Sequence, residues 1–224
     1  MRVTVSERFI RSSIGQKILL ALTGLLLIGF LIVHLAGNLL IFSGPDAYNA
    51  YSEKLVTNPL IYVAEAALLM LFVAHFVTGF VVTRRNRAAR PILYYRQKWV
   101  RRSSHKTLAS TTMILSGLVV LVFVPIHLHT FKFGPRYPSA ADSRVRDLHR
   151  LVVEVFEDPR YVAWYVFALI VIGLHLWHGF GSAFQSLGVT NRGALYRCGQ
   201  MLAVVLAGGF LAIPVIIFLT GARP

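Results

Sequence analysis

The chain has 224 residues, of which 56% are hydrophobic and only 14% are charged, whereas a soluble domain carries about a quarter charged residues. This composition predicts an integral membrane protein and leaves no stretch long enough to bury a separate soluble core. The formal charge of +14 does not predict a nucleic-acid partner, because the position of charges relative to the spans decides their meaning in a membrane chain. The single cysteine, Cys198, excludes an internal disulfide framework, a multi-cysteine iron–sulfur site and a CxxCH haem attachment.

Five apolar runs follow one another along the chain, and each is long enough to cross a bilayer. We expect spans at about 18–42, 59–83, 107–130, 160–184 and 198–219. The first run is too long for a signal-peptide core, so it should remain as a helix. The predicted fold is therefore an all-α membrane protein, with residues 1–224 forming one domain of five transmembrane helices.

The charges between the spans predict the orientation. Nine Lys or Arg residues and no acid lie between residues 84 and 106, whereas the loop 131–159 holds five of the nine acids. Because cytoplasmic loops carry the excess of Lys and Arg, we expect the N-terminus in the cytoplasm and the C-terminus outside. The basic loop is also compatible with a docking surface for a cytoplasmic partner or for anionic lipid.

Four histidines lie each in a different one of the first four predicted spans: His34, His75, His127 and His175. An ionisable side chain inside a span is a functional candidate, although a neutral imidazole can also bond a neighbouring helix. At 1.5 Å per residue, His34 and His127 lie about 23 and 28 Å from the cytoplasmic ends of their spans. His75 and His175 lie about 21–24 Å from the outer ends, so the four form two layers of two.

Two imidazoles per layer favour haem, because zinc and non-haem iron require three or four protein ligands at one point. We therefore expect the five transmembrane helices to be bundled around two haems b, each with two axial histidines. A dinuclear metal site would need further ligands. Glycines three or four residues after a histidine could make room for a porphyrin or simply allow close helix packing. They are Gly37, Gly79 and Gly179.

His178 lies three residues after His175 on the same helix face, so it is an alternative ligand, a propionate partner or part of a quinone pocket. We expect His129 to be interfacial, and His105 and His149 to be solvated in loops.

The sequence also contains a weak internal repeat. The pairs Thr23-Gly24 and Ser116-Gly117 each place a glycine ten residues before a histidine, a coincidence that can arise by chance in apolar helices.

These residues resemble one family: the dihaem cytochrome b membrane-anchor subunit of succinate dehydrogenases and fumarate reductases. The resemblance covers nearly the whole chain. Its motifs are SSIGQKILLALTG (12–24), HLAGN (34–38), His75 followed by YYRQKW (94–99), SG…IHLHTFKFG (116–134) and LHLWHGFGSAFQSLG (174–188). It implies that His75 and His175 bind a proximal haem near the cytoplasm, and that His34 and His127 bind a distal haem. The last motif also favours His175 over His178.

The resemblance further implies that succinate chemistry takes place on other subunits. A flavoprotein subunit with FAD and an iron–sulfur subunit would dock on the cytoplasmic face, and this chain would pass their electrons to a quinone, with menaquinone expected. The location implied is the bacterial cytoplasmic (inner) membrane, and a higher oligomer of the complex is compatible with it. The sequence has no dinucleotide-binding glycine motif and no set of cluster-binding cysteines, in line with that division.

Quinone reduction consumes protons, and Glu65 is the carboxylate that stands out within a span. It lies about 9 Å below the outer end of the second span, near the level of the distal haem. It is either a proton carrier or a structural acid. On the other side, Ser12, Ser13 and Lys17 form either a proximal quinone pocket or a capped helix start.

Two other readings of the chain stay open. It could be the cytochrome b subunit of another respiratory dehydrogenase, such as a hydrogenase or formate dehydrogenase. It could also be a non-redox transporter or scaffold whose histidines bond neighbouring helices.

Overall fold

The computed structural model describes residues 12–89, 112–189 and 192–221, and these residues are almost entirely helical. The α-helices are α2 (Ser13–Leu39), α3 (Pro45–Val56), α4 (Leu60–Ala88), α6 (Met113–His127), α7 (Leu148–Glu157), α8 (Pro159–Ser186) and α9 (Arg192–Thr220). A 3-10 turn, η1 (Leu40–Ser43), extends α2, and a π-helical turn, η2 (Leu128–Lys132), extends α6. Within these ranges the only β pairing is an isolated bridge between Pro138 and Arg146.

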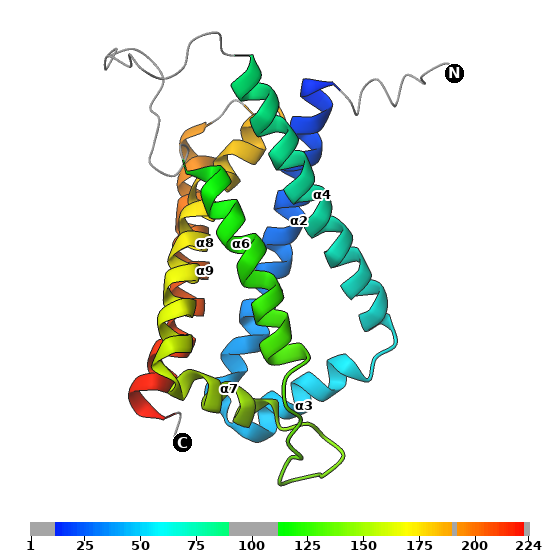
Figure 1. Cartoon of the computed structure of the whole chain (residues 1–224), viewed down its shortest axis with the longest axis vertical. Helices are drawn as coiled ribbons and strands as arrows, with labels where there is room; N and C mark the ends of the chain where they lie inside the picture. Colours follow the sequence, from blue (N-terminus) through cyan, green and yellow to red (C-terminus); the bar gives the residue numbers. More distant parts are fainter. Residues whose placement is uncertain (1–11, 90–111, 190–191, 222–224) are drawn as a thin grey trace.

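Five of these helices are long and apolar enough to cross a membrane: α2 with η1, α4, α6 with η2, α8 and α9. The prediction of an all-α, multi-pass membrane protein with five spans is therefore confirmed. Successive spans run in opposite directions, so the described chain begins at one end of the bundle and finishes at the other (Figure 1).

The helices extend beyond several of the predicted spans. α4 continues to Ala88 and α9 begins at Arg192, because a helix can leave the hydrocarbon layer and continue through polar interfacial residues that carry no apolar signal. At the start of α2 the Ser12 side chain accepts a hydrogen bond from the Gly15 amide at 3.0 Å, so the helix begins before the apolar run does. The start of the third predicted span, 107–111, lies outside the described residues.

The bundle is packed unevenly. α8 lies against α9, α2 lies against α4 and α8, and α6 lies against α8. α4 contacts mainly α2 and leans away from the other spans towards the end that carries α3 (Figure 1). Thr78 is the buried residue of α4, so this helix is held by few contacts.

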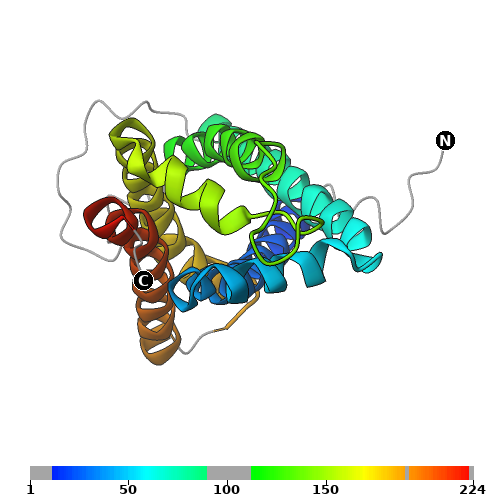
Figure 2. The same cartoon turned by 90° about the horizontal axis from the view of Figure 1, so that it is seen from below.

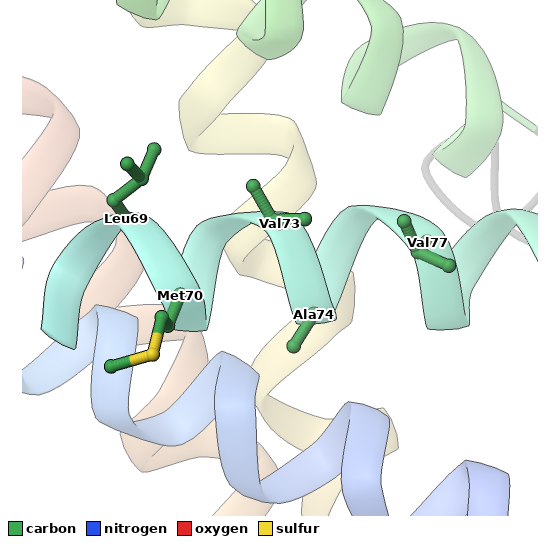
Figure 3. A pocket seen from close by; sticks show the side chains of 5 residues that line it. All are labelled: Leu69, Met70, Val73, Ala74 and Val77. Atoms are coloured by element: carbon green, nitrogen blue, oxygen red, sulfur yellow. The ribbon is translucent and has the colours of Figure 1, made fainter. Parts of the chain in front are cut away.

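The outward face of α4 is apolar. Leu69, Met70, Val73, Ala74 and Val77 line a shallow depression on it (Figure 3). Two residues correspond to about 200° of helical rotation, so Val73 and Val77 lie on the side of α4 opposite His75. An exposed apolar face is what a lipid-facing helix surface requires.

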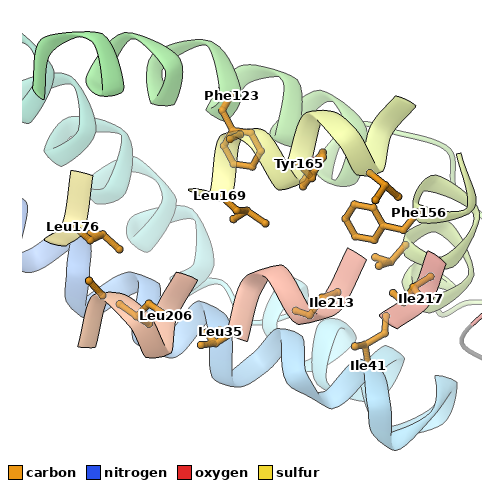
Figure 4. Packing of buried hydrophobic residues seen from close by; sticks show 14 of the residues in the cluster. Leu35, Ile41, Phe123, Phe156, Tyr165, Leu169, Leu176, Leu206, Ile213 and Ile217 are labelled. Atoms are coloured by element: carbon orange, nitrogen blue, oxygen red, sulfur yellow. The ribbon is translucent and has the colours of Figure 1, made fainter. Parts of the chain in front are cut away.

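The apolar core joins α2, α6, α8 and α9 and extends from Leu176 and Ala203 to the end of the bundle nearest the C-terminus. Phe123, Tyr165 and Phe156 approach one another there, and Leu35 lies close to α9 (Figure 4). Ile217, on the last turns of α9, is fully buried. The core therefore lies mainly on the side of the bundle away from α4.

Two short helices, α3 and α7, lie across the same end (Figure 2). They are joined by Asn49, which is only 3% exposed. Its amide nitrogen donates to Asp147 Oδ1 at 2.8 Å, and its amide oxygen accepts from the His149 backbone amide at 2.9 Å. Asp147 also caps α7 through the Arg150 amide. We call α3 and α7 together the end cap.

The end cap corrects the expectation that His149 is a solvated loop residue. His149 lies on α7, is half-buried, and contacts the ring of Tyr48 on α3. Tyr48 is buried as well, and its hydroxyl donates to Asn38 Oδ1 at 3.1 Å. Burial, followed by the nearby Tyr51 phenol, raises the pKa of Tyr48 to about 12, so the phenol stays protonated and able to donate.

Charge is distributed unequally between the two ends. Eight of the nine acids lie between residues 46 and 65 or between 142 and 158, at or near the end cap. At the opposite end, Arg84, Arg85 and Arg87 are exposed on the last turns of α4. The predicted basic loop from residue 90 to 106, and His105 with it, lies outside the described residues.

Candidate functional site

The structure brings the four span histidines together as two pairs. The ring centroids of His34 on α2 and His127 on α6 are 5.8 Å apart, with the planes at 86°. Those of His75 on α4 and His175 on α8 are 6.3 Å apart, with the planes at 70°. These are the two pairs that the depth argument predicts, and we call them the distal and the proximal pair. All four side chains are half-buried.

Aromatic rings surround the distal pair. Phe30 stacks on His34 with a centroid separation of 5.1 Å, and Phe123 stacks on His127 at 5.6 Å. Phe210 of α9 lies 5.7 Å from His34. Three helices therefore supply a desolvated, largely apolar environment around these two imidazoles.

Small residues of the neighbouring helices lie beside the proximal pair. A Cβ atom placed on Gly24 would lie 3.0 Å from His75 Cε1, and one placed on Gly117 would lie 3.8 Å from His175 Cε1. α2 thus allows the His75 ring to lie close to its backbone, and α6 offers His175 similar but looser space.

Every one of the four imidazoles has a polar group at Nδ1. Thr23 Oγ1 is 3.2 Å from His75 Nδ1, and Ser116 Oγ is 2.9 Å from His175 Nδ1. In the distal pair, the Tyr165 hydroxyl is 3.3 Å from His127 Nδ1, and Asn38 Nδ2 is 3.3 Å from His34 Nδ1. Nε2 takes part in none of these four interactions, so it is the ring nitrogen left for another partner.

This donor set fits a metal ion with two axial imidazoles. Two imidazoles that bind one metal from opposite sides, each through a nitrogen at about 2 Å, have ring centroids roughly 6 Å apart. The measured 5.8 and 6.3 Å agree with that spacing. A metal-binding histidine usually donates the hydrogen on its second nitrogen to a neighbouring acceptor, and a hydroxyl oxygen that can accept it lies at Nδ1 of three of the four: His75, His127 and His175. Among the described residues, no group of three or more His, Cys, Asp or Glu is arranged to hold a metal ion.

One buried donor near the distal pair has no partner. Trp164 Nε1 is buried and makes no hydrogen bond within the described chain, although its ring lies 6.4 Å from that of Phe123. A buried N–H without an acceptor is costly. A carboxylate or carbonyl group of a bound molecule is the kind of acceptor that it could use.

The other predicted site residues lie apart from the two pairs. His178 remains half-buried on α8, while His175 is the residue whose ring meets His75. Glu65 forms an ion pair with Lys132, the last residue of the π-helical turn, and both side chains are about two-fifths exposed. Ser12 caps α2, while Ser13 and Lys17 are exposed on its first turns.

The glycines need one correction. A Cβ on Gly37 would lie 2.6 Å from Tyr51 Cε1, so Gly37 makes room for a tyrosine of the end cap and not for a porphyrin. Gly79 faces Leu20, and nothing lies within 4 Å of a Cβ on Gly179. The glycines that approach the histidines are Gly24 and Gly117.

Sequence reasoning missed the partners of the imidazoles: Thr23, Ser116, Tyr165 and Asn38. A signal was present for two of them, because Thr23-Gly24 and Ser116-Gly117 form the repeated pair that the sequence analysis treats as a coincidence.

Comparison with known proteins adds no assignment to this geometry. No protein-family model matches the chain, and no curated protein or solved structure matches it significantly.

Proposed function

We propose that this chain is the dihaem cytochrome b anchor of a succinate:quinone oxidoreductase and carries electrons from a cytoplasmic iron–sulfur subunit to a quinone. The observation that carries the proposal is the pairing of the histidines. Four spans each supply one imidazole, and the imidazoles meet in two pairs, each with a polar group at Nδ1. The succinate site itself is expected on another subunit.

Haem b bound between each pair would supply one-electron transfer within the membrane. The chain's own part is to hold the imidazoles. His75 and His175 would ligate the proximal haem, and His34 and His127 the distal haem. The aromatic rings around the distal pair exclude water, and the unpartnered Trp164 N–H could bind a propionate or a quinone carbonyl.

The spacing between the layers supports electron transfer. Thr23, which contacts the proximal pair, is eleven residues before His34 on the same helix; Ser116 stands in the same relation to His127. Eleven residues rise about 16 Å along a helix, so the layers are stacked across the membrane and not side by side.

The charge distribution supports the orientation. The exposed arginines at the end of α4 would face the cytoplasm and the acidic end cap would face outward, following the excess of positive charge in cytoplasmic loops. On this proposal, the flavoprotein subunit with FAD and the iron–sulfur subunit dock at the arginine end, in a bacterial cytoplasmic membrane. Copurification of these subunits separates this function from that of an anchor for a hydrogenase or formate dehydrogenase.

Glu65 is the proposed proton carrier for quinone, with menaquinone the expected substrate. Its carboxylate is partly exposed and paired with Lys132, so it can exchange protons with the outer surface. Lys132 lies five residues after His127, which places the ion pair at the outer edge of the distal layer. His178 remains a candidate contact for the proximal haem or for quinone.

The test is to count haems in the purified complex by the pyridine haemochrome assay, with single alanine variants of the four histidines. We expect two haems b per chain, and the same haem should be lost from His34→Ala and from His127→Ala. His75→Ala and His175→Ala should both lose the other haem. Absence of haem from the intact complex would refute the proposal, and loss of different haems within one pair would refute the pairing.

A further inference from the structure

Thr23 is buried on α2, 4% exposed, and its hydroxyl is shared between two helices. Oγ1 lies 2.8 Å from the Leu19 carbonyl oxygen on its own helix and 3.2 Å from His75 Nδ1 on α4. A hydroxyl has one hydrogen and two lone pairs. The carbonyl oxygen can only accept, whereas an imidazole Nδ1 can donate or accept, so both contacts are satisfied only when the hydroxyl hydrogen goes to the carbonyl. Towards His75 the oxygen can then only accept, and Nδ1 must carry the hydrogen.

Ser116 repeats this arrangement on α6. It is 6% exposed, and its Oγ lies 3.0 Å from the Met113 carbonyl oxygen and 2.9 Å from His175 Nδ1. The carbonyl again takes the only hydroxyl hydrogen, which assigns the Nδ1 hydrogen to His175 as well.

The two arrangements are equivalent in sequence and in space. In each, a hydroxyl residue is followed by a glycine, and the pair on one helix contacts a histidine on the next span. Gly24 borders His75 and Gly117 borders His175. Equivalent contacts on both sides of one pair indicate a shared requirement of the two imidazoles, because general helix packing would not place a buried hydroxyl at the same ring atom twice.

We infer that Thr23 and Ser116 are positioning residues that hold His75 and His175 in the Nδ1–H tautomer, so that both Nε2 lone pairs are available to one haem iron. This inference rests on the proposed function and adds to it the residues that prepare the proximal site. Neither hydroxyl touches the iron. Each acts through an imidazole by fixing its rotation and its tautomer, and by accepting the Nδ1 hydrogen it makes Nε2 a stronger electron donor.

The distal pair differs, and this difference makes the inference specific. His34 Nδ1 faces the Asn38 amide nitrogen, which also donates to the His34 carbonyl oxygen at 2.8 Å. The Asn38 oxygen accepts from Tyr48, so Asn38 offers a donor to the ring and not an acceptor. His127 Nδ1 faces the Tyr165 hydroxyl at 3.3 Å, but no carbonyl oxygen of the described residues shares that hydroxyl. Among the described residues, a hydroxyl placed between a helix carbonyl oxygen and an imidazole of a pair is therefore found in the proximal layer alone.

The experiment compares Thr23→Val and Ser116→Ala with the conservative variants Thr23→Ser and Ser116→Thr, all in the complete complex. Thr83→Val is the matched control, because Thr83 Oγ1 bonds the Gly79 carbonyl oxygen of its own helix in the same way, at 2.8 Å. The readouts are haem content, the midpoint potential of each haem by redox titration, and the electron paramagnetic resonance signal of each oxidised low-spin haem.

We expect Thr23→Val and Ser116→Ala to weaken proximal haem binding by about 10–100-fold. Haem that remains should have a raised midpoint potential and a changed resonance signal. The distal haem should keep its wild-type values, Thr83→Val should match wild type, and the conservative variants should restore the proximal signals. If Thr23→Val lowers the amount of complex, Thr23→Ala provides the same test without adding bulk.

Wild-type potential, signal and affinity in both hydroxyl-free variants would overturn the inference while leaving the proposed function intact. Equal changes at both haems would also overturn it, because they would indicate a general loosening of the bundle. A wild-type complex without haem would instead refute the proposed function.

Discussion

Gly24→Ala is expected to displace one ligand of the proximal site, whereas Gly117→Ala is expected to be tolerated. The added Cβ would lie 3.0 Å from His75 Cε1, whereas ordinary van der Waals contact begins at 3.4 Å. His75 must then withdraw by at least about 0.4 Å, close to the roughly 0.5 Å tolerance of a functional site. Cε1 joins the two ring nitrogens, so the shift moves Nε2 and lengthens the bond of Nδ1 to Thr23, which already measures 3.2 Å.

The two substitutions should also differ in their effect on the stability of the fold. Within a helix, Gly to Ala gains up to about 1 kcal/mol of intrinsic stability, whereas overpacking costs about 1–3 kcal/mol. At Gly117 the new atom would lie 3.8 Å from His175 Cε1, without overlap. We expect Gly117→Ala to keep both haems and to unfold at the wild-type temperature or slightly above. Gly24→Ala should lose proximal haem and gain no stability.

The assay is haem per polypeptide together with thermal unfolding in detergent. Both substitutions are the same chemical change on equivalent helices. A difference in haem content between the two variants therefore reports the 0.8 Å difference in how closely the added Cβ approaches the two imidazole rings. Equal haem contents in the two variants would refute the reasoning that close approach at Gly24 positions His75.

Two further predictions concern the end cap. Asn49→Leu removes both hydrogen bonds between α3 and α7 and leaves their partners unsatisfied, so the unfolding free energy should fall by about 2–4 kcal/mol. The control Asn58→Ala, at an exposed position, should change the unfolding free energy by less than about 1 kcal/mol. Equal shifts in the unfolding temperature of the two variants would contradict the role of Asn49 in joining α3 to α7. The pKa of Tyr48 is raised from 10.0 to about 12, so its stabilising contribution is complete below pH 10 and is lost as the pH rises towards 12, by up to about 2.7 kcal/mol. Tyr48→Phe should flatten the fall in unfolding temperature over this range, and an unchanged pH profile would contradict the burial argument.

The spans and the histidine pairs could be predicted because each depends on local quantities. Apolar length fixes where a chain can cross a bilayer, and a rise of 1.5 Å per residue fixes the depth of each residue within its span. His34 and His127 share one depth, and His75 and His175 share another. Depth alone therefore predicted which imidazoles could meet.

Contacts that depend on the rotation and spacing of neighbouring helices could not be predicted in this way. Gly37 lies on the same face as His34 by sequence, yet the space beside it is taken by Tyr51 from a helix that was not predicted. Thr23 contacts His75 across a separation of 52 residues, and no periodicity within α2 reveals that contact.

Helix α7 of the end cap could have been predicted, because the sequence contains its amphipathic pattern. Apolar residues recur in α7 at the spacing of one helical face: Leu148, Leu151, Val152, Val155 and Phe156. The five acids between residues 131 and 159 indicate a loop between two spans, so the sequence analysis predicts no helix there. Polarity separates this segment from the spans, and the structure agrees, but polarity does not exclude an amphipathic helix there.

The uneven packing of the bundle links the proximal site to the stability of the fold. α4 is the least buried span and is held mainly by α2. Between helices in lipid, burial of apolar side chains provides little drive, so close approach at small residues and hydrogen bonds must hold them together. The contact of His75 with Thr23 and Gly24 is of both kinds. A ligand shared by His75 and His175 would join α4 to α8, on the well-packed side of the bundle. Such a ligand would therefore also stabilise the helix that the chain's own packing holds least.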